Sequence, residues 1–375
     1  MSAWTFSEGH LYQGKVNLKD LLPRELEAFF ASLGEPAYRA RQVIRWLYVR
    51  RVDDIDQMTD LSKALRARLK EVAVVPSLRV RQVLQSRQET SKFLFELADG
   101  SVVESVCMRY LEHLGPGRLA ACISTQVGCA MACDFCASGK LGLYRHLSTW
   151  EIVDQVTQIQ KHLDASGARV ANVVYMGIGE PLHNYENTLR SVRLLAHGDG
   201  LGIGMRHLAI STSGLVPQIR RLAAEKLPLK LAISLHATDD ATRTRLMPVN
   251  KRWGLQELLA ACRDYQAATG RRLTFEYVML DGVNDSVQDA RRLVELLRGI
   301  RALVNVIPWN PIEGVPFGRS RSAAVRAFQE TLEAAGVRCT VRQEKGTDIN
   351  AACGQLRLQE TVRRRRLLGA DAASA

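Results

Sequence analysis

The stretch Val127-Gly-Cys-Ala-Met-Ala-Cys-Asp-Phe-Cys-Ala137 contains three cysteines, Cys129, Cys133 and Cys136, with the spacing C-x3-C-x2-C. Thiolates this close together can turn inward on one irregular loop and hold one metal centre. A structural zinc site closes with four ligands, and an iron–sulfur cube that only carries electrons also takes four cysteines. Three ligands on one loop therefore favour a four-iron cluster with one iron left open for another molecule.

Two other interpretations of the cysteine stretch stay open at this point. It could be a zinc loop, or its cysteines could be buried as small hydrophobic side chains. The rest of the chain agrees better with the cluster. In a cytosolic chain of this size, we expect the eight cysteines to bind metal or to act in redox chemistry before they form a disulfide framework.

Size and composition indicate a two-part soluble protein with a polyanionic partner. The chain has 375 residues, enough for one barrel-sized domain and a small accessory unit, and 46% of them are hydrophobic. No apolar run approaches the roughly 20 residues that a membrane span needs, and the N-terminus lacks a signal-peptide pattern. We therefore expect a cytoplasmic protein with no membrane partner. The net charge of +12 makes nucleic acid the first candidate partner.

The apolar pattern divides the chain into a helical part and a strand–helix part. Residues 17–80 carry apolar side chains at helical spacing. Lys92–Leu97 and Val102–Met108 flank an Asp99-Gly100 turn and predict a hairpin. From Leu119 onward, apolar strands alternate with helices, which predicts a parallel sheet closed or partly closed into a barrel. The predicted strands are Leu119–Ser124, Val170–Met176, His207–Ser211, Leu229–Leu235, Leu273–Met279, Ala302–Ile307 and Arg338–Arg342. The predicted helices are Thr149–Leu163, Tyr185–Ala196, Val216–Glu225, Leu255–Ala268, Val287–Leu297 and Arg321–Ala335.

Glycines and small polar residues follow the predicted strands. Examples are Met176-Gly-Ile-Gly-Glu-Pro181, Ser211-Thr-Ser-Gly214, Ser234-Leu-His-Ala237 and Pro308-Trp-Asn-Pro311. For any one of them, an ordinary turn or cap is the favoured interpretation. Chemistry in a βα barrel collects at the carboxyl ends of the strands. Glycines and small polar residues recur at the carboxyl ends of these predicted strands, in register with the cysteine loop. This recurrence therefore favours a ligand pocket.

Together these features resemble the RlmN family of radical S-adenosylmethionine (SAM) enzymes, which methylate C2 of adenosine in rRNA and tRNA. The resemblance covers about Leu18 to Leu358. The cysteine spacing marks only the radical SAM superfamily, whereas Gly346–Leu356, which contains Cys353, is far more specific. The other matching stretches are Gly177–Asn184, Ser211–Pro217, Leu231–Ala237, Leu246–Asn250, Phe275–Leu280 and Ile307–Pro311.

The resemblance implies an α/β fold, a partial (β/α)6 radical SAM barrel with a small N-terminal helical accessory domain. We expect the RNA-binding accessory domain in residues 1–95, the barrel in 96–350, and a C-terminal segment with a basic tail in 351–375. The resemblance also implies a [4Fe-4S] cluster, with SAM on its open iron. The implied cluster ligands are Cys129, Cys133 and Cys136. The implied SAM contacts are Gly179, Glu180, Ser211, Ser234, Leu235, His236 and Asn310.

The resemblance further implies roles for three residues in the reaction. Cys353 would carry the methyl group as S-methylcysteine, Cys122 would resolve the product through a transient disulfide, and Glu104 would accept a proton. The chemistry gives a reason for a methyl carrier. C2 of adenine is a poor nucleophile, so direct transfer of the methyl group from SAM should fail. A radical route avoids that difficulty. Both cysteine steps need a thiolate, which an exposed, electropositive site favours.

The implied substrates are large-subunit rRNA at the peptidyl-transferase centre and tRNA next to the anticodon. The basic helical unit would grip phosphates without reading sequence. Recognition would then rest on loop shape and an unstacked base. The resemblance also implies an electron donor such as flavodoxin, and we expect a monomer.

Several alternatives stay open. Related enzymes methylate C8 of the same rRNA adenosine, but they tend to have alanine after the glutamate where this chain has Glu180-Pro181, so we favour C2. A cluster-containing RNA-binding protein without catalysis would not need Cys353 and Cys122 together. A generic radical SAM activase would lack a methylatable cysteine. The Tyr110–Arg118 loop is longer than usual in the family, and Cys107 has no predicted role.

Overall fold

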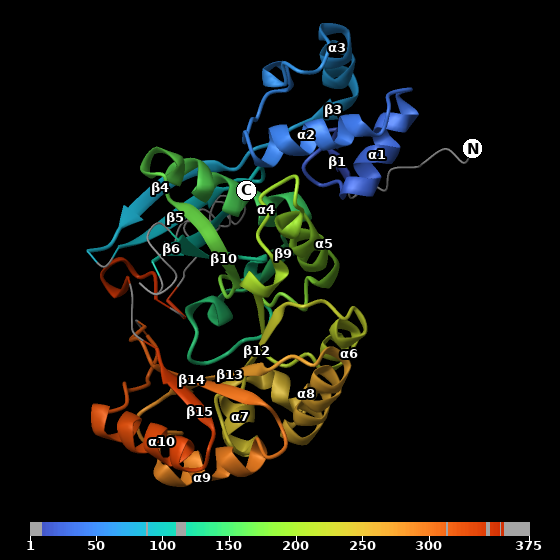
Figure 1. The fold of residues 1–375 in the computed structure, drawn as a ribbon. Coiled ribbons are helices and arrows are strands. Elements are labelled where there is room, and N and C mark those ends of the chain that lie inside the picture. The colour runs from blue at the N-terminus through green and yellow to red at the C-terminus, as the bar shows by residue number, and fades with distance from the viewer. Residues whose placement is uncertain are drawn as a thin grey trace, which may run out of the picture.

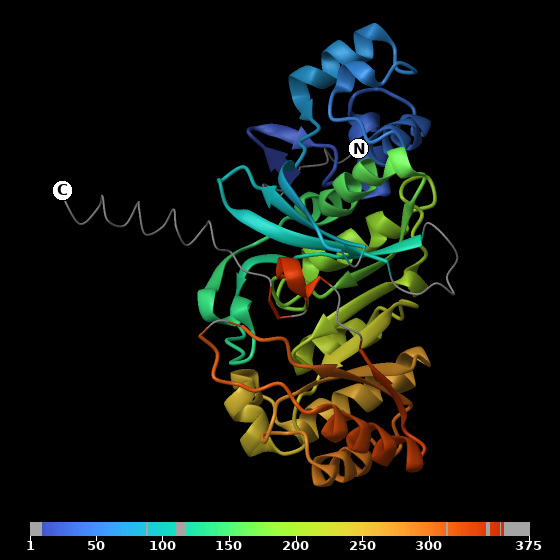
Figure 2. The same ribbon diagram turned by 90° about the vertical axis from the view of Figure 1, so that its left-hand side faces the viewer.

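The computed structural model describes residues 10–87, 89–109, 118–312, 314–342, 346–352 and 354–355. Figures 1 and 2 show a small helical unit at one end, next to a large sheet flanked by helices. Cys353, most of the Tyr110–Arg118 loop and the basic tail lie outside the described residues.

The first part of the chain folds into short α-helices with a small sheet. Buried apolar side chains recur at every third or fourth position, as in α2, where Val43, Ile44 and Leu47 are buried. This confirms the predicted helices in this part. The elements are β1 (Leu11–Tyr12), β2 (Lys15–Asn17), α1 (Pro23–Ser32), α2 (Tyr38–Tyr48), η2 (Ile55–Gln57), α3 (Lys63–Val72) and β3 (Ala73–Val74).

A ten-stranded sheet forms the main body, in the order β15-β14-β13-β12-β11-β10-β7-β6-β5-β4. From β7 to β15 the neighbours pair in parallel, and β6, β5 and β4 continue the sheet as antiparallel strands. Strand β13, Leu273-Thr-Phe-Glu-Tyr-Val-Met279, is rich in β-branched and aromatic residues and almost wholly buried. The strands are β4 (Arg79–Gln85), β5 (Thr90–Glu96), β6 (Val102–Met108), β7 (Arg118–Cys122), β10 (Arg169–Tyr175), β11 (Leu208–Thr212), β12 (Lys230–Ser234), β13 (Leu273–Met279), β14 (Ala302–Pro308) and β15 (Arg338–Val341).

Helices follow the parallel strands and lie outside the sheet (Figure 1). This alternation confirms the predicted α/β barrel-type architecture. Helix α4 begins with a capping box, in which Ser148 N donates to Glu151 Oε2 at 2.9 Å. In the described part of the chain, no helix is long and apolar enough to cross a membrane. The helices are α4 (Thr149–Leu163), α5 (Tyr185–Ala196), α6 (Val216–Ala224), α7 (Asp240–Leu246), α8 (Leu255–Thr269), α9 (Val287–Leu296) and α10 (Ser322–Ala334).

The structure adds elements that the apolar pattern did not predict. Strands β8 (Gln126–Cys129) and β9 (Gly142–His146) form a hairpin that encloses the cysteine loop, and α7 follows β12. Helix α7, Asp-Ala-Thr-Arg-Thr-Arg-Leu, is short and polar, so its sequence carries too little apolar periodicity to reveal a helix.

A buried ion pair joins the N-terminal helical unit to α4. Lys19 Nζ donates to Asp154 Oδ1 at 2.7 Å, and both side chains are almost fully buried. The second Asp154 oxygen accepts from Leu78 N at 2.7 Å. Because a buried charge is costly unless it is paired, this contact favours one fixed placement of the helical unit on the barrel.

We expect Asp154→Ala to lower the free energy of unfolding by about 3–5 kcal/mol, because it leaves the Lys19 ammonium buried without its partner. Urea denaturation followed by circular dichroism measures the change. The matched control is Glu295→Ala, which removes the exposed Arg298–Glu295 pair and should cost less than about 1 kcal/mol. Equal losses in the two variants would contradict a central role for the buried pair.

Candidate active site

One pocket lies at the carboxyl ends of the parallel strands. All three cysteines of the cysteine loop line it. So do six of the residues that the family resemblance assigns to SAM: Gly179, Glu180, Ser211, Ser234, His236 and Asn310. The fold thus gathers side chains from β10, β11, β12, β14 and the cysteine loop around one cavity.

Leu235, the seventh of those residues, does not line the pocket with its side chain. It is fully buried in the hydrophobic core. Its backbone N donates to Glu276 O at 3.0 Å, and its carbonyl accepts from Arg243 Nε at 3.1 Å. Leu235 therefore supports the wall between Ser234 and His236 instead of facing the cavity.

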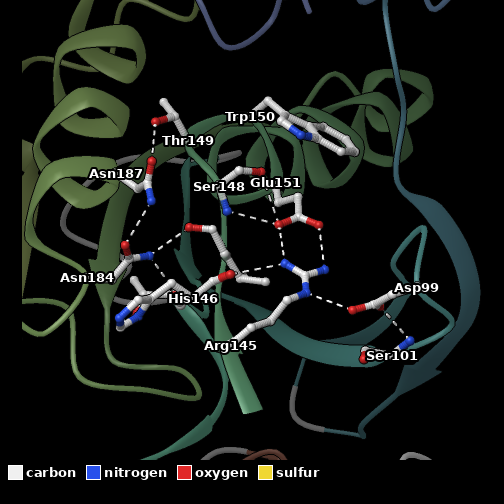
Figure 3. Close-up of polar contacts among 12 residues, drawn as sticks. Asp99, Ser101, Arg145, His146, Ser148, Thr149, Trp150, Glu151, Asn184 and Asn187 are labelled. Carbon is white, nitrogen blue, oxygen red and sulfur yellow. Dashed lines mark hydrogen bonds and ion pairs between the residues drawn. The ribbon is translucent and has the colours of Figure 1, made fainter. Parts of the chain in front are cut away.

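The β8–β9 hairpin, which carries Cys129, is clamped through Arg145. Figure 3 shows the guanidinium between Glu151 and Asp99, with Nη1 and Nη2 at 2.8 and 2.9 Å from the Glu151 oxygens and Nε at 2.7 Å from Asp99 Oδ2. Asn184 adds a second contact, because its amide donates to the two carbonyls that flank the hairpin, at 2.9 and 2.7 Å. Bidentate arginine–carboxylate pairs are strong and directional, so the hairpin is fixed to both α4 and the β5–β6 turn.

Segments from distant parts of the sequence bind the cysteine loop itself. A loop that turns several side chains toward one point cannot pair its backbone groups in a regular ladder, so other segments must satisfy them. The contacts are Asp134 N to Leu246 O at 3.0 Å, Ala137 N to Gly354 O at 2.9 Å and Trp309 Nε1 to Phe135 O at 3.2 Å.

The three thiols of the cysteine loop are close enough to influence one another's protonation. Burial raises the pKa of Cys129 to about 12 and that of Cys133 well above its usual value, and the neighbouring thiols add to both shifts. Among the described residues, no set of three His, Cys, Asp or Glu side chains is placed to hold a single metal ion. Three thiols on one loop fit a four-iron cluster, whose cysteine ligands bind different irons. Bound metal would deprotonate these thiols.

Backbone N–H groups hold Glu180 at the pocket wall. Its Oε1 accepts from Leu182 N at 3.0 Å, and its Oε2 accepts from Ser213 N at 2.7 Å. Burial raises the pKa of Glu180, while the backbone donors oppose that shift. Glu180 N in turn donates to Gln126 Oε1 at 2.7 Å. Glu180 is therefore a fixed acceptor for a cationic ligand group, tied directly to the cysteine hairpin.

Two glycines let the Glu180 stretch approach the segment from Ile123 to Gln126, which leads into that hairpin. A Cβ on Gly177 would lie 2.6 Å from Ile123 O, and one on Gly179 would lie 2.7 Å from Gln126 Cβ. Gly179 also has a φ of +110°, which favours glycine. A side chain at either position would push Glu180 away from the cysteines.

His236 offers the pocket a neutral imidazole. Its Nδ1 accepts from Val278 N at 3.0 Å, so the ring proton belongs on Nε2. Burial, with a smaller contribution from Arg243, lowers the pKa of His236 to about 3. The ring meets Phe135 edge-on, with centroids 4.9 Å apart. His236 is therefore a hydrogen-bond donor that stays uncharged at neutral pH.

Glu104 and Cys122 lie on one face of neighbouring strands, together with Lys92. Cys122 is opposite Val106, which is in turn opposite Lys92, and Glu104 is two residues from Val106. Side chains of opposed residues, and of residues two apart in a strand, share a face. Lys92 Nζ lies 3.4 Å from Glu104 Oε1, and both side chains are buried. The sheet thus brings together two of the residues predicted for the reaction.

The segments on both sides of Cys353 are described, although Cys353 itself is not. Asp348 in the η8 turn (Thr347–Ile349) accepts from Ser86 Oγ at 2.6 Å. Asn350 O accepts from Lys92 Nζ at 3.3 Å. Figure 2 shows this turn, in red, beside the blue-green strands of the antiparallel edge. Together with the contact from Ala137 N to Gly354 O, these bonds hold the flanks of Cys353 between that edge and the cysteine loop.

Sequence reasoning missed three residues that the structure places at or next to the site. Lys92 is a charged residue at an inward position of a mostly apolar strand, a signal that could have identified it. Gln126 lies three residues before Cys129, but nothing in the sequence ties it to Glu180. Arg243 is fully buried although its polar helix reads as a surface element. The placements of Gln126 and Arg243 follow from tertiary contacts alone.

The chain matches two family profiles. Residues 16–75 match the family described as the ribosomal RNA large subunit methyltransferase N-terminal domain. Residues 123–295 match the radical SAM superfamily. The first match covers the helical unit, and the second begins just before the cysteine loop.

Similar proteins cover nearly the whole chain. A "probable dual-specificity RNA methyltransferase RlmN" from a Thermoanaerobacter species is 46% identical over 342 residues, which are 91% of this chain and 97% of that protein. The protein of the same name from Moorella thermoacetica is 47% identical over 346 residues, covering 92% and 97%. The crystal structure of a radical SAM methyltransferase from Sphaerobacter thermophilus matches with a TM-score of 0.86 at 47% identity, covering 91% of this chain and 99% of that one.

Cys133→Ala should prevent stable iron loading, because it removes one of three thiols that share the pocket. The measurement is iron and sulfide per chain after anaerobic reconstitution, with the visible spectrum. Cys339→Ala is the matched control, since Cys339 lies on β15 away from the pocket lining, and it should load like the wild type. A colourless protein that binds zinc through the same cysteines would contradict the cluster.

Proposed function

Because the chain belongs to the RlmN family of radical SAM RNA methyltransferases, we propose that it methylates C2 of an adenosine in large-subunit rRNA and in tRNA next to the anticodon. One observation carries this proposal beyond the family relation. The flanks of Cys353 are bound to the cysteine loop through the 2.9 Å contact from Ala137 N to Gly354 O. A methyl-carrying cysteine must lie next to the SAM pocket, so this contact supports the carrier role.

We assign the cluster to Cys129, Cys133 and Cys136, and SAM to the pocket that they line. When bound, the cluster and SAM together supply the electron, the methyl group and the radical chemistry of the reaction. Glu180 would bind the ammonium of SAM through its fixed carboxylate, and His236 would donate from Nε2. The pocket wall is largely buried, so these residues would also keep water away from the reacting groups.

Glu104 takes the proton from C2 in this proposal, and Lys92 prepares it to do so. A base must be ionised before it accepts a proton, and a buried carboxylate needs a compensating charge. The Lys92 ammonium, 3.4 Å from Glu104 Oε1, supplies that charge. The same ammonium donates to Asn350 O, so Lys92 would also fix the distance between the base and the carrier segment.

Cys122 completes the cycle by releasing the product. Its thiolate attacks the sulfur of Cys353, so that an S–S bond forms and the S–C bond to the product breaks. The released carbon takes the electron pair and a proton and becomes the methyl group. A two-electron reductant then returns both cysteines to thiols.

We assign RNA binding to the N-terminal helical unit. Arg41 and Arg45 on α2, and Arg68 and Lys70 on α3, are exposed basic residues that would contact phosphates. We also propose that a flavodoxin supplies the electron and that the protein acts as a monomer. Methylation at C8 is the second candidate, and Pro181 after Glu180 is the feature that favours C2 over it.

The central test is anaerobic incubation of reconstituted protein with SAM, reductant and unmodified rRNA fragments or tRNA, followed by mass spectrometry of the nucleosides. We expect 2-methyladenosine, and none with Cys353→Ala. Formation of 8-methyladenosine would show that the protein methylates C8 instead of C2. SAM cleavage without any methylated base would contradict the carrier role of Cys353.

Lys92→Met should lower the rate of 2-methyladenosine formation at least about tenfold, the order expected for losing a general-base contribution. Iron content and SAM binding should stay unchanged, because Lys92 does not line the SAM pocket. Lys161→Met, which removes an exposed lysine on α4, is the matched control and should react like the wild type. An unchanged rate in Lys92→Met would remove Lys92 from the mechanism.

Glu180→Gln should weaken SAM binding by about 10- to 100-fold, the equivalent of one charge-assisted hydrogen bond. Equilibrium dialysis with reconstituted protein gives the dissociation constant, and iron analysis confirms that the cluster is retained. Glu186→Gln is the control, because its carboxylate is exposed on α5 and pairs with Arg221. Similar affinities for all three proteins would show that Glu180 does not contact SAM.

A further inference from the structure

Arg243 on α7 is a fully buried cation, and its hydrogen bonds to described residues all go to neutral groups. Its Nη2 donates to Ser213 O at 2.7 Å and to Ser234 O at 3.1 Å. Its Nη1 donates to Asn250 Oδ1 at 2.8 Å, and its Nε donates to Leu235 O at 3.1 Å. Among the residues that the structure describes, no carboxylate contacts this guanidinium. A neutral donor could bridge these carbonyls without the cost of burying a charge, so the charge itself requires an explanation.

The acidic groups nearest to Arg243 are one carboxylate and the neighbouring thiols, and they differ in their position relative to the guanidinium. Asp240 reaches Arg243 only through Asn250, whose Nδ2 donates to Asp240 Oδ1 at 2.8 Å. Asp240 is also exposed, so water screens its charge. The other acidic neighbours are thiols. Cys133 of the cysteine loop raises the pKa of Arg243, and Asp240 raises it to a smaller extent.

Arg243 lies directly behind the wall of the cysteine pocket. Ser213 and Ser234, whose carbonyls it binds, both line that pocket. Helix α7 ends at Leu246, whose carbonyl accepts from Asp134 N in the cysteine loop at 3.0 Å. A Cβ on Gly214 would lie 3.2 Å from Arg243 Nη2, so this glycine leaves room for the guanidinium. Helix α7 thus carries the cation and also binds the cysteine loop.

The pKa of Arg243 is consistent with this placement. Burial lowers it to about 10, and the neighbouring Cys133 acts in the opposite direction. Arg243 therefore stays protonated at neutral pH, and an anionic centre on the cysteines would favour its charged form further.

We propose that Arg243 is the internal countercharge of the iron–sulfur centre held by Cys129, Cys133 and Cys136, and that it raises the reduction potential of that centre. The proposal rests on the cluster assigned under the proposed function, but not on the RNA substrate or the methylated carbon. One electron arriving from the donor adds one negative charge and changes no bond to Arg243. A fixed cation stabilises that added charge, and net charge near a cluster is one of the factors that set its potential. Arg243 would thus act on electron transfer through the cluster, by its charge, and not by contact with the reacting atoms.

The test is a reductive titration of anaerobically reconstituted protein, followed by electron paramagnetic resonance, for the wild type, Arg243→Lys and Arg243→Gln. We expect the equilibrium constant for one-electron reduction to fall about tenfold in Arg243→Gln, which is about 59 mV more negative. Arg243→Lys should stay near the wild type. The titration is run with and without SAM. A shift seen only with SAM would assign the countercharge to the SAM carboxylate and overturn the proposal.

A second variant keeps Arg243 in place, in case its replacement prevents folding. The double variant Asp240→Asn with Asn250→Asp preserves composition and net charge but moves a carboxylate to the acceptor position of Arg243 Nη1. Because the guanidinium would then be neutralised locally, the potential should fall as in Arg243→Gln. Asp240→Asn alone removes a negative charge and should not lower it. A potential unchanged in the double variant, with normal iron content, would contradict the proposal.

Thermal unfolding separates a countercharge from a purely structural arginine. Arg243→Gln should lower the unfolding temperature of the reconstituted protein more than that of the cluster-free protein, because only the former contains the anion. Equal losses in both forms would show a structural role alone. These readouts need no RNA, so a failed methylation assay with the expected potential shift would refute the proposed substrate while leaving Arg243 as the countercharge.

Discussion

The cysteine loop satisfies only some of its backbone groups internally, and the rest of the site depends on how distant segments bind the others. Asp134 pairs with the end of α7, Phe135 pairs with Trp309 after β14, and Ala137 pairs with Gly354 near the C-terminus. A buried backbone group without a partner is costly. The cysteines, the helix that carries Arg243 and the flanks of Cys353 are therefore held in place by the same few hydrogen bonds.

Each buried charged side chain around the pocket is held by polar partners. Backbone N–H groups hold Glu180, Lys92 holds Glu104, and neutral carbonyls hold Arg243. Burying such groups is costly, and replacing them by apolar side chains is often neutral or stabilising. Their presence in one small region supports the electrostatic roles proposed for them: binding a cationic ligand group, keeping a base ionised, and stabilising an added electron.

Local sequence signals were sufficient to predict the bounds of an element where that element is long and its apolar pattern is regular. The predicted bounds of α4 and α5 agree with the structure, and the capping box at Ser148 and Glu151 explains why α4 begins where it does. The β8–β9 hairpin and α7 were not predicted, because both are short and depend on tertiary contacts such as the Arg145 clamp. Leu235 shows that a residue within a matching motif can place its side chain in the core.

By itself, the sequence determined the cysteine spacing, the order of strands and helices, and the membership of the family, because these depend on residue types and short periods. Only the tertiary structure decided that Lys92, Glu104 and Cys122 share a face, that Asn350 joins them, and that Arg243 lies behind the cysteines. Such neighbours depend on strand register and on which face each side chain takes, and a shift of one residue would reverse that face. Apolar periodicity alone does not specify the register between strands so far apart in the chain.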